Sequence, residues 1–282
     1  MFEGQLVGVK DQGWCGASWV FSALSVAQNR LGHSGSAKGH CDTYTHTSTH
    51  LDTNTHAKTP PSDFKETLNH SHKCLLAAYR LVMESNGVYR VSFSAQDLLS
   101  CGSLGVNGCL GGHLDRAWHY LRMTGALPEV CYPYRSGFTR KLPTCAKNSG
   151  LGCQSRYKSG PAYRLPSKER YIQREIITNG PVQALMTVHP DFFLYKTGVY
   201  SYSELGSPHS AAHSVKLLGW GEERVNGKTV KYWVNVNSWG KYWGEAGYFR
   251  LLRGSNECGI ESHVFTAKPQ CESLYHGLEM EC

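Results

Sequence analysis

The sequence predicts an α+β protein with two lobes, helical in its first half and rich in β-strands in its second half. Three observations predict this fold class. Apolar residues recur at helical spacing between Val20 and Leu31. Runs of β-branched and aromatic residues dominate after residue 182. The chain has 282 residues, of which 40% are hydrophobic, and this is enough to bury a sizeable core.

Four helices are predicted before residue 180. Each shows an apolar face or a local start or stop signal, such as the serine that opens the second helix and the glycines that end the third and fourth. They span residues 18–31, 94–99, 113–123 and 167–179. Between the last two lies a stretch, 131–165, that is expected to be rich in loops.

Four strands follow. They are expected at residues 182–188, 215–221, 231–237 and 248–252. Asn226-Gly227 is typical of a tight hairpin turn and is expected to join the second and third of these strands.

Residues 32–80 form a segment rich in His, Thr and Ser without apolar periodicity, and a disordered insertion is the expected state. A metal-binding tract with Cys41 and Cys74 is the alternative, but the spacings match no structural zinc pattern, so no metal is predicted. Alternating Thr and His is also what a translated CA-dinucleotide repeat produces. The histidines in question are His33, His40, His46, His50, His56, His70 and His72.

The net charge limits the classes of binding partner, and the cysteine content indicates the cellular compartment. The net charge is +7 without a run of five basic residues, so nucleic acid is a poor candidate, whereas acidic glycans and matrix proteins remain open. Apolar runs are far shorter than the roughly 18–20 residues of a membrane span. Eleven cysteines indicate an oxidising, extracellular compartment. The first residues carry no secretory signal, and we therefore expect the chain to lack its natural N-terminus. No cofactor is expected.

Four short motifs carry the chemistry: Gln-Gly-Trp-Cys-Gly-Ala-Ser-Trp at 12–19, Gly-Cys-Leu-Gly-Gly at 108–112, His-Ser-Val at 213–215 and Asn-Ser-Trp-Gly at 237–240. In this order the chain resembles the papain-like cysteine protease family over residues 5–265. Segments 180–182, 192–200 and 257–262 are similar to its cathepsin B branch. The resemblance implies a papain-like domain at 1–270 and a tail at 271–282. It also implies a helical left lobe, an antiparallel β-barrel-like right lobe and a peptide-binding cleft between them.

The resemblance assigns a role to each motif. Gln12 would donate to the oxyanion, His213 would act as base and Asn237 would orient it, with position 18 holding the nucleophile. The substrate-binding residues would be Gly111, Gly112 and Trp239. The two glycines let a peptide approach closely, and the indole of Trp239 shields the Asn–His contact from water.

Position 18 departs from the family pattern because Ser18 stands where the family has cysteine. A hydroxyl does not ionise as a thiol does at a helix N-terminus, so proteolysis is expected to be lost. A serine here resembles the tubulointerstitial nephritis antigen group within the cathepsin B branch. That similarity implies a secreted protein of the basement membrane or of cell adhesion, binding a peptide or matrix protein in the cleft or on its basic surface.

Several alternatives remain open. Ser18, His213 and Asn237 could form a slow serine peptidase, the cleft could capture peptides as a decoy or inhibitor, or the chain could be a product that does not fold. Ser18 could simply cap the helix and His213 could be an ordinary core histidine. Residues 131–165 contain no histidine, so the dipeptidase activity of cathepsin B is not expected.

The family pattern also implies disulfides. Cys15 is expected to bridge Cys109, with less specific pairings of Cys101 with Cys145 and Cys131 with Cys153. Cys258 is expected to be a buried free thiol.

Overall fold

The computed structural model describes residues 9–34, 92–102, 108–145, 153, 156–203 and 209–269. Residues 35–80 of the predicted insertion, and the predicted tail at 271–282, lie outside these ranges. The domain boundaries therefore stay predictions. Among the helices that the structure describes, none is long and apolar enough to cross a membrane.

In these ranges, four α-helices follow the predicted order along the chain, and a fifth, short one lies in the stretch expected to be rich in loops. Ser94 Oγ accepts a hydrogen bond from Asp97 N and so caps the second predicted helix, while Gly180 ends the last one with a positive φ of 91°. The α-helices are α1 Ser18–Ser34, α3 Ala95–Cys101, α4 Leu114–Met123, α5 Ser136–Thr139 and α6 Glu169–Asn179. Short 3-10 turns occur at η2 Gly108–Leu110, η3 Glu129–Cys131, η4 Pro190–Leu194 and η5 Glu257–Gly259.

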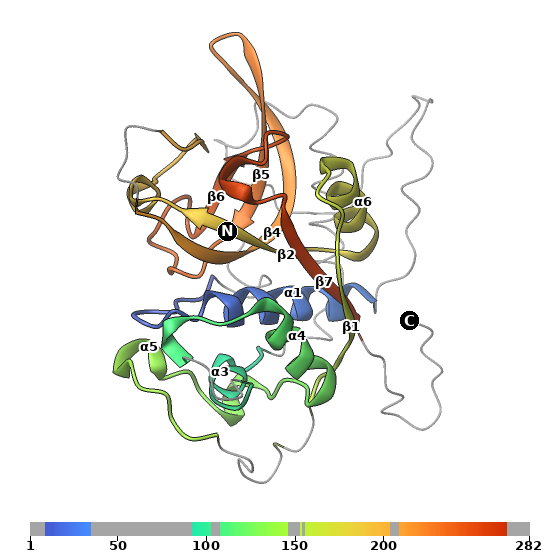
Figure 1. The fold of residues 1–282 in the computed structure, drawn as a ribbon, viewed down its shortest axis with the longest axis vertical. Helices are drawn as coiled ribbons and strands as arrows, with labels where there is room; N and C mark the ends of the chain where they lie inside the picture. The colour runs from blue at the N-terminus through green and yellow to red at the C-terminus, as the bar shows by residue number, and fades with distance from the viewer. Residues whose placement is uncertain are drawn as a thin grey trace, which may run out of the picture.

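Helix α1 lies between the two lobes, with α3, α4 and α5 on one side and the sheet on the other (Figure 1). It contacts β4 and β7 of the sheet and α3 and α4 of the helical lobe. Its position places the N-terminus of α1, at Ser18, where the two lobes meet.

The second lobe is built on one seven-stranded sheet in the order β1-β7-β2-β4-β5-β6-β3. The described pairings are antiparallel, except that β3 runs parallel to β6. The strands are β1 Ser159–Arg164, β2 Val182–Val188, β3 Val199–Tyr200, β4 Ala211–Val225, β5 Lys228–Val236, β6 Tyr248–Leu252 and β7 His263–Pro269. Since β1 and β3 remain as edges, the sheet is open rather than a closed barrel.

Three strands of this sheet were not predicted. β1 lies inside the stretch expected to be loop, the short β3 lies between the first and second predicted strands, and β7 follows the last predicted strand. The sequence of β1, Ser-Gly-Pro-Ala-Tyr-Arg, contains a glycine and a proline, which ordinarily disfavour strands. It pairs only with β7, as an edge strand, and this is the position in a sheet that tolerates proline.

Each lobe has its own core. One cluster of buried apolar residues joins the start of α1 to α3 and α4, and a second joins α6 to the central strands of the sheet. Trp118 anchors the first cluster and Trp233 and Phe249 the second, all at most 1% exposed. Separate cores joined along α1 give the two-lobed architecture.

A buried lysine lies in the contact between α1 and the sheet. Lys216 on β4 is 4% exposed, and its Nζ donates to Asn29 Oδ1 at 2.8 Å. Burial disfavours the ammonium, which has no carboxylate partner among the described residues, and lowers the pKa of Lys216 from 10.5 to about 8.

This pKa predicts a specific dependence of stability on pH. Between pH 8 and 10.5 the unfolded chain holds a proton on Lys216 that the folded chain has released, so stability rises with pH across that window. Relative to a Lys216→Met variant, the free energy of unfolding of the wild type is expected to increase by about 3 kcal/mol from pH 7.5 to pH 11. Denaturant unfolding with intact disulfides measures this difference. Parallel pH curves for the two proteins would contradict it.

Candidate functional site

The predicted oxyanion donor, Gln12, is held by hydrogen bonds that include two with Ser238 and one with Cys15. Gln12 N donates to Ser238 O at 2.8 Å, which ties this segment to the Asn-Ser-Trp-Gly motif. The Gln12 side chain is 8% exposed; its Oε1 accepts from Ser238 Oγ at 2.7 Å and its Nε2 donates to Cys15 O at 2.9 Å. Because an amide nitrogen carries two hydrogens, the second one of Nε2 is not needed for that bond.

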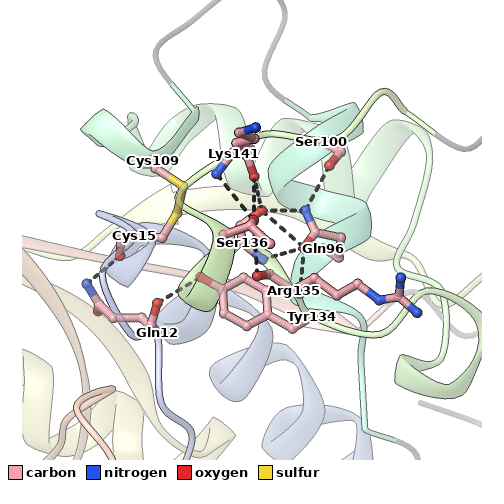
Figure 2. Close-up of a disulfide and its surroundings, with 10 residues drawn as sticks. Gln12, Cys15, Gln96, Ser100, Cys109, Tyr134, Arg135, Ser136 and Lys141 are labelled. Carbon is pink, nitrogen blue, oxygen red and sulfur yellow. Dashed lines mark hydrogen bonds between the residues drawn. A yellow bond between two sulfur atoms is a disulfide. The ribbon is translucent and has the colours of Figure 1, made fainter.

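A disulfide holds the segment before α1 against the glycine-rich motif. Figure 2 shows the bond between Cys15 and Cys109 beside Gln12, and Gly16 N donates to Cys109 O at 2.7 Å. A Cβ added to Gly16 would lie 2.6 Å from that same carbonyl oxygen. Only glycine permits this approach. The close packing of the two backbones therefore explains why a glycine follows Cys15 in the motif.

The two predicted substrate-binding glycines follow this disulfide. Gly111 has a positive φ of 112°, and open space surrounds the point where a Cβ would stand. A Cβ on Gly112 would lie 2.4 Å from the ring of Trp19, the residue after Ser18. The backbone at Gly112 therefore passes directly over the first turn of α1.

Ser18 is the first residue of α1, and it is 9% exposed. Its Oγ accepts a hydrogen bond from Ser214 N at 3.3 Å. The helix starts at Ser18 itself, so the alternative in which Ser18 is the N-cap residue is wrong. In the part of the chain that the structure describes, Ser18 Oγ forms no hydrogen bond with the ring of His213.

His213 on β4 stands one residue before this contact and is 6% exposed. Its Nε2 lies 2.8 Å from Asn237 Oδ1, which also accepts from Ser238 N at 2.8 Å. The ring of Trp239 packs against the imidazole with centroids 4.8 Å apart, and the ring of Phe193 stacks on Trp239 at 4.9 Å. Aromatic rings thus keep water from the His213–Asn237 pair.

Burial sets the charge of the imidazole. Desolvation lowers the pKa of His213 from 6.5 to about 4, and the hydrogen bond with Asn237 offsets only part of this effect. His213 is therefore neutral at physiological pH. It can accept a proton, but it is a weak base for drawing one from a hydroxyl group.

A buried polar network behind Ser18 was missed by the sequence analysis. Ser22 Oγ lies 2.8 Å from Ser214 Oγ and donates to Ser18 O at 2.6 Å. Gln183 Nε2 on β2 donates to both hydroxyls, at 2.7 and 3.1 Å, while Gln183 Oε1 accepts from Trp118 Nε1 at 2.7 Å. Polar residues on the inward face of strands are the signal that could have revealed it, because buried polar groups need partners.

Among the described residues, three disulfides have the expected pairings, Cys15–Cys109, Cys101–Cys145 and Cys131–Cys153. Cys258 carries a free thiol that is half-buried rather than fully buried. Burial and the nearby Glu257 and Asp191 raise the pKa of the Cys258 thiol to about 12, so it stays protonated.

The predicted site residues thus lie at the junction of the two lobes, around the N-terminus of α1. Gln12 and Trp239 come from two paired segments, and His213 and Asn237 are in direct contact. Within the described ranges, no three His, Cys, Asp or Glu side chains gather as a metal-ligand set. The predicted histidine-rich tract lies outside those ranges, apart from the backbone of His33 in α1.

Residues 76–268 match the model of the papain family of cysteine proteases, which is more than half of the chain. The motif with Ser18 precedes the matched residues. Two relatives of similar identity are tubulointerstitial nephritis antigen-like of Homo sapiens, 44% identical over 67% of this chain, and tubulointerstitial nephritis antigen of Bos taurus, 41% identical over 70%. Cathepsin B-like protease 1 of Arabidopsis thaliana is 35% identical over 67% of this chain.

The chain spans only about half of these relatives, 46%, 47% and 52% of their respective lengths. Among solved structures, procathepsin B S9 from Trypanosoma congolense is similar with a TM-score of 0.66 and 28% identity, over 95% of this chain and 73% of that one. Procathepsin L 3 of Tenebrio molitor gives a TM-score of 0.62 at 26% identity, over 93% of this chain and 66% of that one.

The buried state of His213 leads to a test by NMR. In the wild type the imidazole signals are expected to titrate near pH 4. In an Asn237→Asp variant a carboxylate replaces the amide at hydrogen-bond distance, so the pKa of His213 is expected to rise above 6.5. Histidine-selective labelling resolves the titration, and a His213→Ala variant assigns the signal. A wild-type value near 6.5 would show that water reaches the ring.

Proposed function

Because the chain belongs to the papain family of cysteine proteases, we propose that it is a catalytically silent, cathepsin B-like member that acts by binding. Its place of action is extracellular, in the basement membrane, other matrix or cell adhesion. The observation that carries this proposal is a hydroxyl, Ser18 Oγ, at the N-terminus of α1 where the family has a thiol.

Each site residue keeps a role in this proposal. Gln12 would supply the amide donor of the oxyanion site, Asn237 would orient His213, and Trp239 would shield that pair. Gly111 and Gly112 would offer a backbone edge to an extended peptide, since space is open around Gly111 and the packing of Gly112 on Trp19 requires glycine. The site thus retains the groups for binding a peptide while lacking the group that attacks it.

The expected absence of catalysis follows from the charge states of the nucleophile and of the imidazole. In a thiol enzyme the thiolate and the imidazolium stabilise each other, so the nucleophile exists before substrate arrives. A serine hydroxyl offers no such anion to His213. With a pKa of about 4, the imidazole of His213 gains little by taking the proton of Ser18. The Ser18 hydroxyl instead accepts a hydrogen bond from Ser214 N.

Two features support the extracellular, adhesive part of the proposal. Three disulfides are stable in oxidising compartments and uncommon in the cytosol. The net charge of +7 favours acidic partners such as matrix components. The similarity to the tubulointerstitial nephritis antigen group agrees with both.

A weak serine peptidase is the second candidate. It is favoured by one observation, the intact contact between His213 and Asn237, which would hold a neutral base in place. In that case Ser18 Oγ would attack the peptide carbonyl as its proton passes to the imidazole, and the Gln12 amide would stabilise the oxyanion.

Peptide hydrolysis distinguishes the two candidates. The full chain, secreted with an added signal sequence, is expected to show no turnover of a fluorogenic peptide above that of a Ser18→Ala variant. A Ser18→Cys variant is expected to gain at least about a thousandfold, because it restores the ionisable nucleophile.

The control is a double variant, Ser18→Cys with His213→Ala, which should lose the gained activity. Turnover by the Ser18 protein that disappears in the Ser18→Ala variant would overturn the silent assignment and favour the serine peptidase.

The adhesive role is tested by retention of the secreted chain on a reconstituted basement membrane. We expect retention at physiological salt that decreases as salt is raised, since the basic surface contributes. Equal recovery of the chain from the basement membrane and from an albumin-coated surface would contradict the matrix role while leaving the catalytic result intact.

A further inference from the structure

We propose that an exposed aromatic and cationic patch beside the N-terminus of α1 is a docking surface for an acidic protein segment with apolar side chains. This inference rests on the binding function proposed above and names the chemistry of the partner. The rim patch consists of Trp14, Leu110, Arg135, Phe138, Arg140 and Lys141.

The rim patch exposes large apolar side chains that a folded protein ordinarily hides. Phe138 is 90% exposed, Leu110 is 86% exposed and Trp14 is 75% exposed. Isolated exposed apolar residues need no explanation, but a group of them marks an interaction site. Trp and Phe are also enriched where partner proteins bind.

These residues belong to one surface although they come from three segments. The Cα atoms of Cys15 and Cys109 are 4.4 Å apart in the disulfide. Trp14 and Leu110 adjoin these two cysteines in the sequence, so their backbones are neighbours in space. Trp14 N donates to Gly137 O at 3.0 Å, which places the Trp14 backbone beside the turn that carries Phe138.

The turn that carries Phe138 is held rigidly from below. Gln96 of α3 is fully buried, and its Oε1 accepts from Arg135 N at 2.9 Å and from Ser136 N at 3.1 Å. Ser136 Oγ donates to Lys141 O at 2.8 Å and so closes the turn (Figure 2). A rigid presentation lowers the entropy cost of binding, which is a property of docking surfaces rather than of mobile loops.

The charge of the rim patch specifies an acidic partner. The guanidinium of Arg140 lies over the ring of Trp14, 4.8 Å from its centroid, and the exposed Arg135 and Lys141 flank the same turn. In the described part of the chain none of these three cations forms an ion pair. Arg140 also has a positive φ of 54°, a conformation that costs energy for any residue with a Cβ, yet the position carries an arginine.

A protein segment fits this surface better than a sulfated glycan. A glycan chain is matched by cations alone and gains little from burying Phe138 and Leu110. An acidic segment with apolar side chains satisfies both halves of the rim patch, with carboxylates on the guanidinium groups and apolar side chains on the exposed rings.

The test uses a defined probe, a short fluorescein-labelled peptide in which glutamate alternates with phenylalanine or leucine. Fluorescence anisotropy with the full secreted chain is expected to show saturable binding. Two matched peptides, one with glutamine for glutamate and one with serine for the apolar residues, are each expected to bind about tenfold more weakly. A heparin-derived oligosaccharide is expected not to displace the probe at the same charge concentration.

The variants Phe138→Ser and Arg140→Gly are each expected to weaken probe binding about tenfold. Neither should unfold the protein, since Phe138 packs against little and glycine suits the backbone of residue 140. The control is Arg224→Gln with Val225→Ser, which removes one exposed cation and one exposed apolar residue from the β4–β5 hairpin.

The possible results separate the two proposals. Absent probe binding, equal loss in the control variant, or displacement by the oligosaccharide would each overturn the docking surface. Probe binding that is lost in Phe138→Ser supports it, even when the chain is not retained on basement membrane. Retention that persists unchanged in both rim-patch variants would leave the matrix role in place and exclude this surface as its cause.

Discussion

The structure depends on the buried hydrogen bonds that fasten helix α1 to the sheet. Gln183 Nε2 reaches Trp19 O and the hydroxyls of Ser22 and Ser214, and so links two turns of α1 to both β2 and β4. Each of these groups would be costly to leave without a partner, and this favours the arrangement seen in the structure. That arrangement fixes the rotation of α1, and with it the position of Ser18 opposite β4. The two cores then form on either side of a helix that is already placed.

Under the proposed function, a single atom separates this site from catalysis, the oxygen of Ser18 in place of a thiol sulfur. Geometry alone would permit the family's reaction, since His213, Asn237 and Gln12 are held by contacts that do not involve residue 18. The protonation states of Ser18 and His213 favour that reaction less than those of a thiol and an imidazole would. The buried imidazole of His213 is neutral and the Ser18 hydroxyl accepts from Ser214 N instead, so the two groups provide no preformed anion. Conversely, the proposed binding function uses the contacts that remain, and the proposed rim patch adds a surface that catalysis does not require.

Much of the fold could be predicted from the sequence, for reasons that particular elements illustrate. The periodicity of α1 and the turn at Asn226-Gly227 are local signals, and β2 and β6 have the predicted bounds. β1 could not be predicted, because its pairing with β7 comes from a segment about a hundred residues away in the chain. Strand β4 extends four residues before its predicted start, into the polar residues that carry His213, since pairing with β2 rather than local propensity stabilises that end.

By itself the sequence determined the residue types of the site, their order, the cysteine pairs suggested by family resemblance, and the serine at position 18. Tertiary structure alone decided the state of those residues. The low pKa of His213 comes from burial beneath Trp239, a contact between distant segments, and the burial of Lys216 comes from the packing of α1 on β4. Desolvation depends on everything that surrounds a group, whereas a sequence motif records only its neighbours along the chain. For the same reason the rim patch, which is assembled from three segments, could be recognised only in the folded structure.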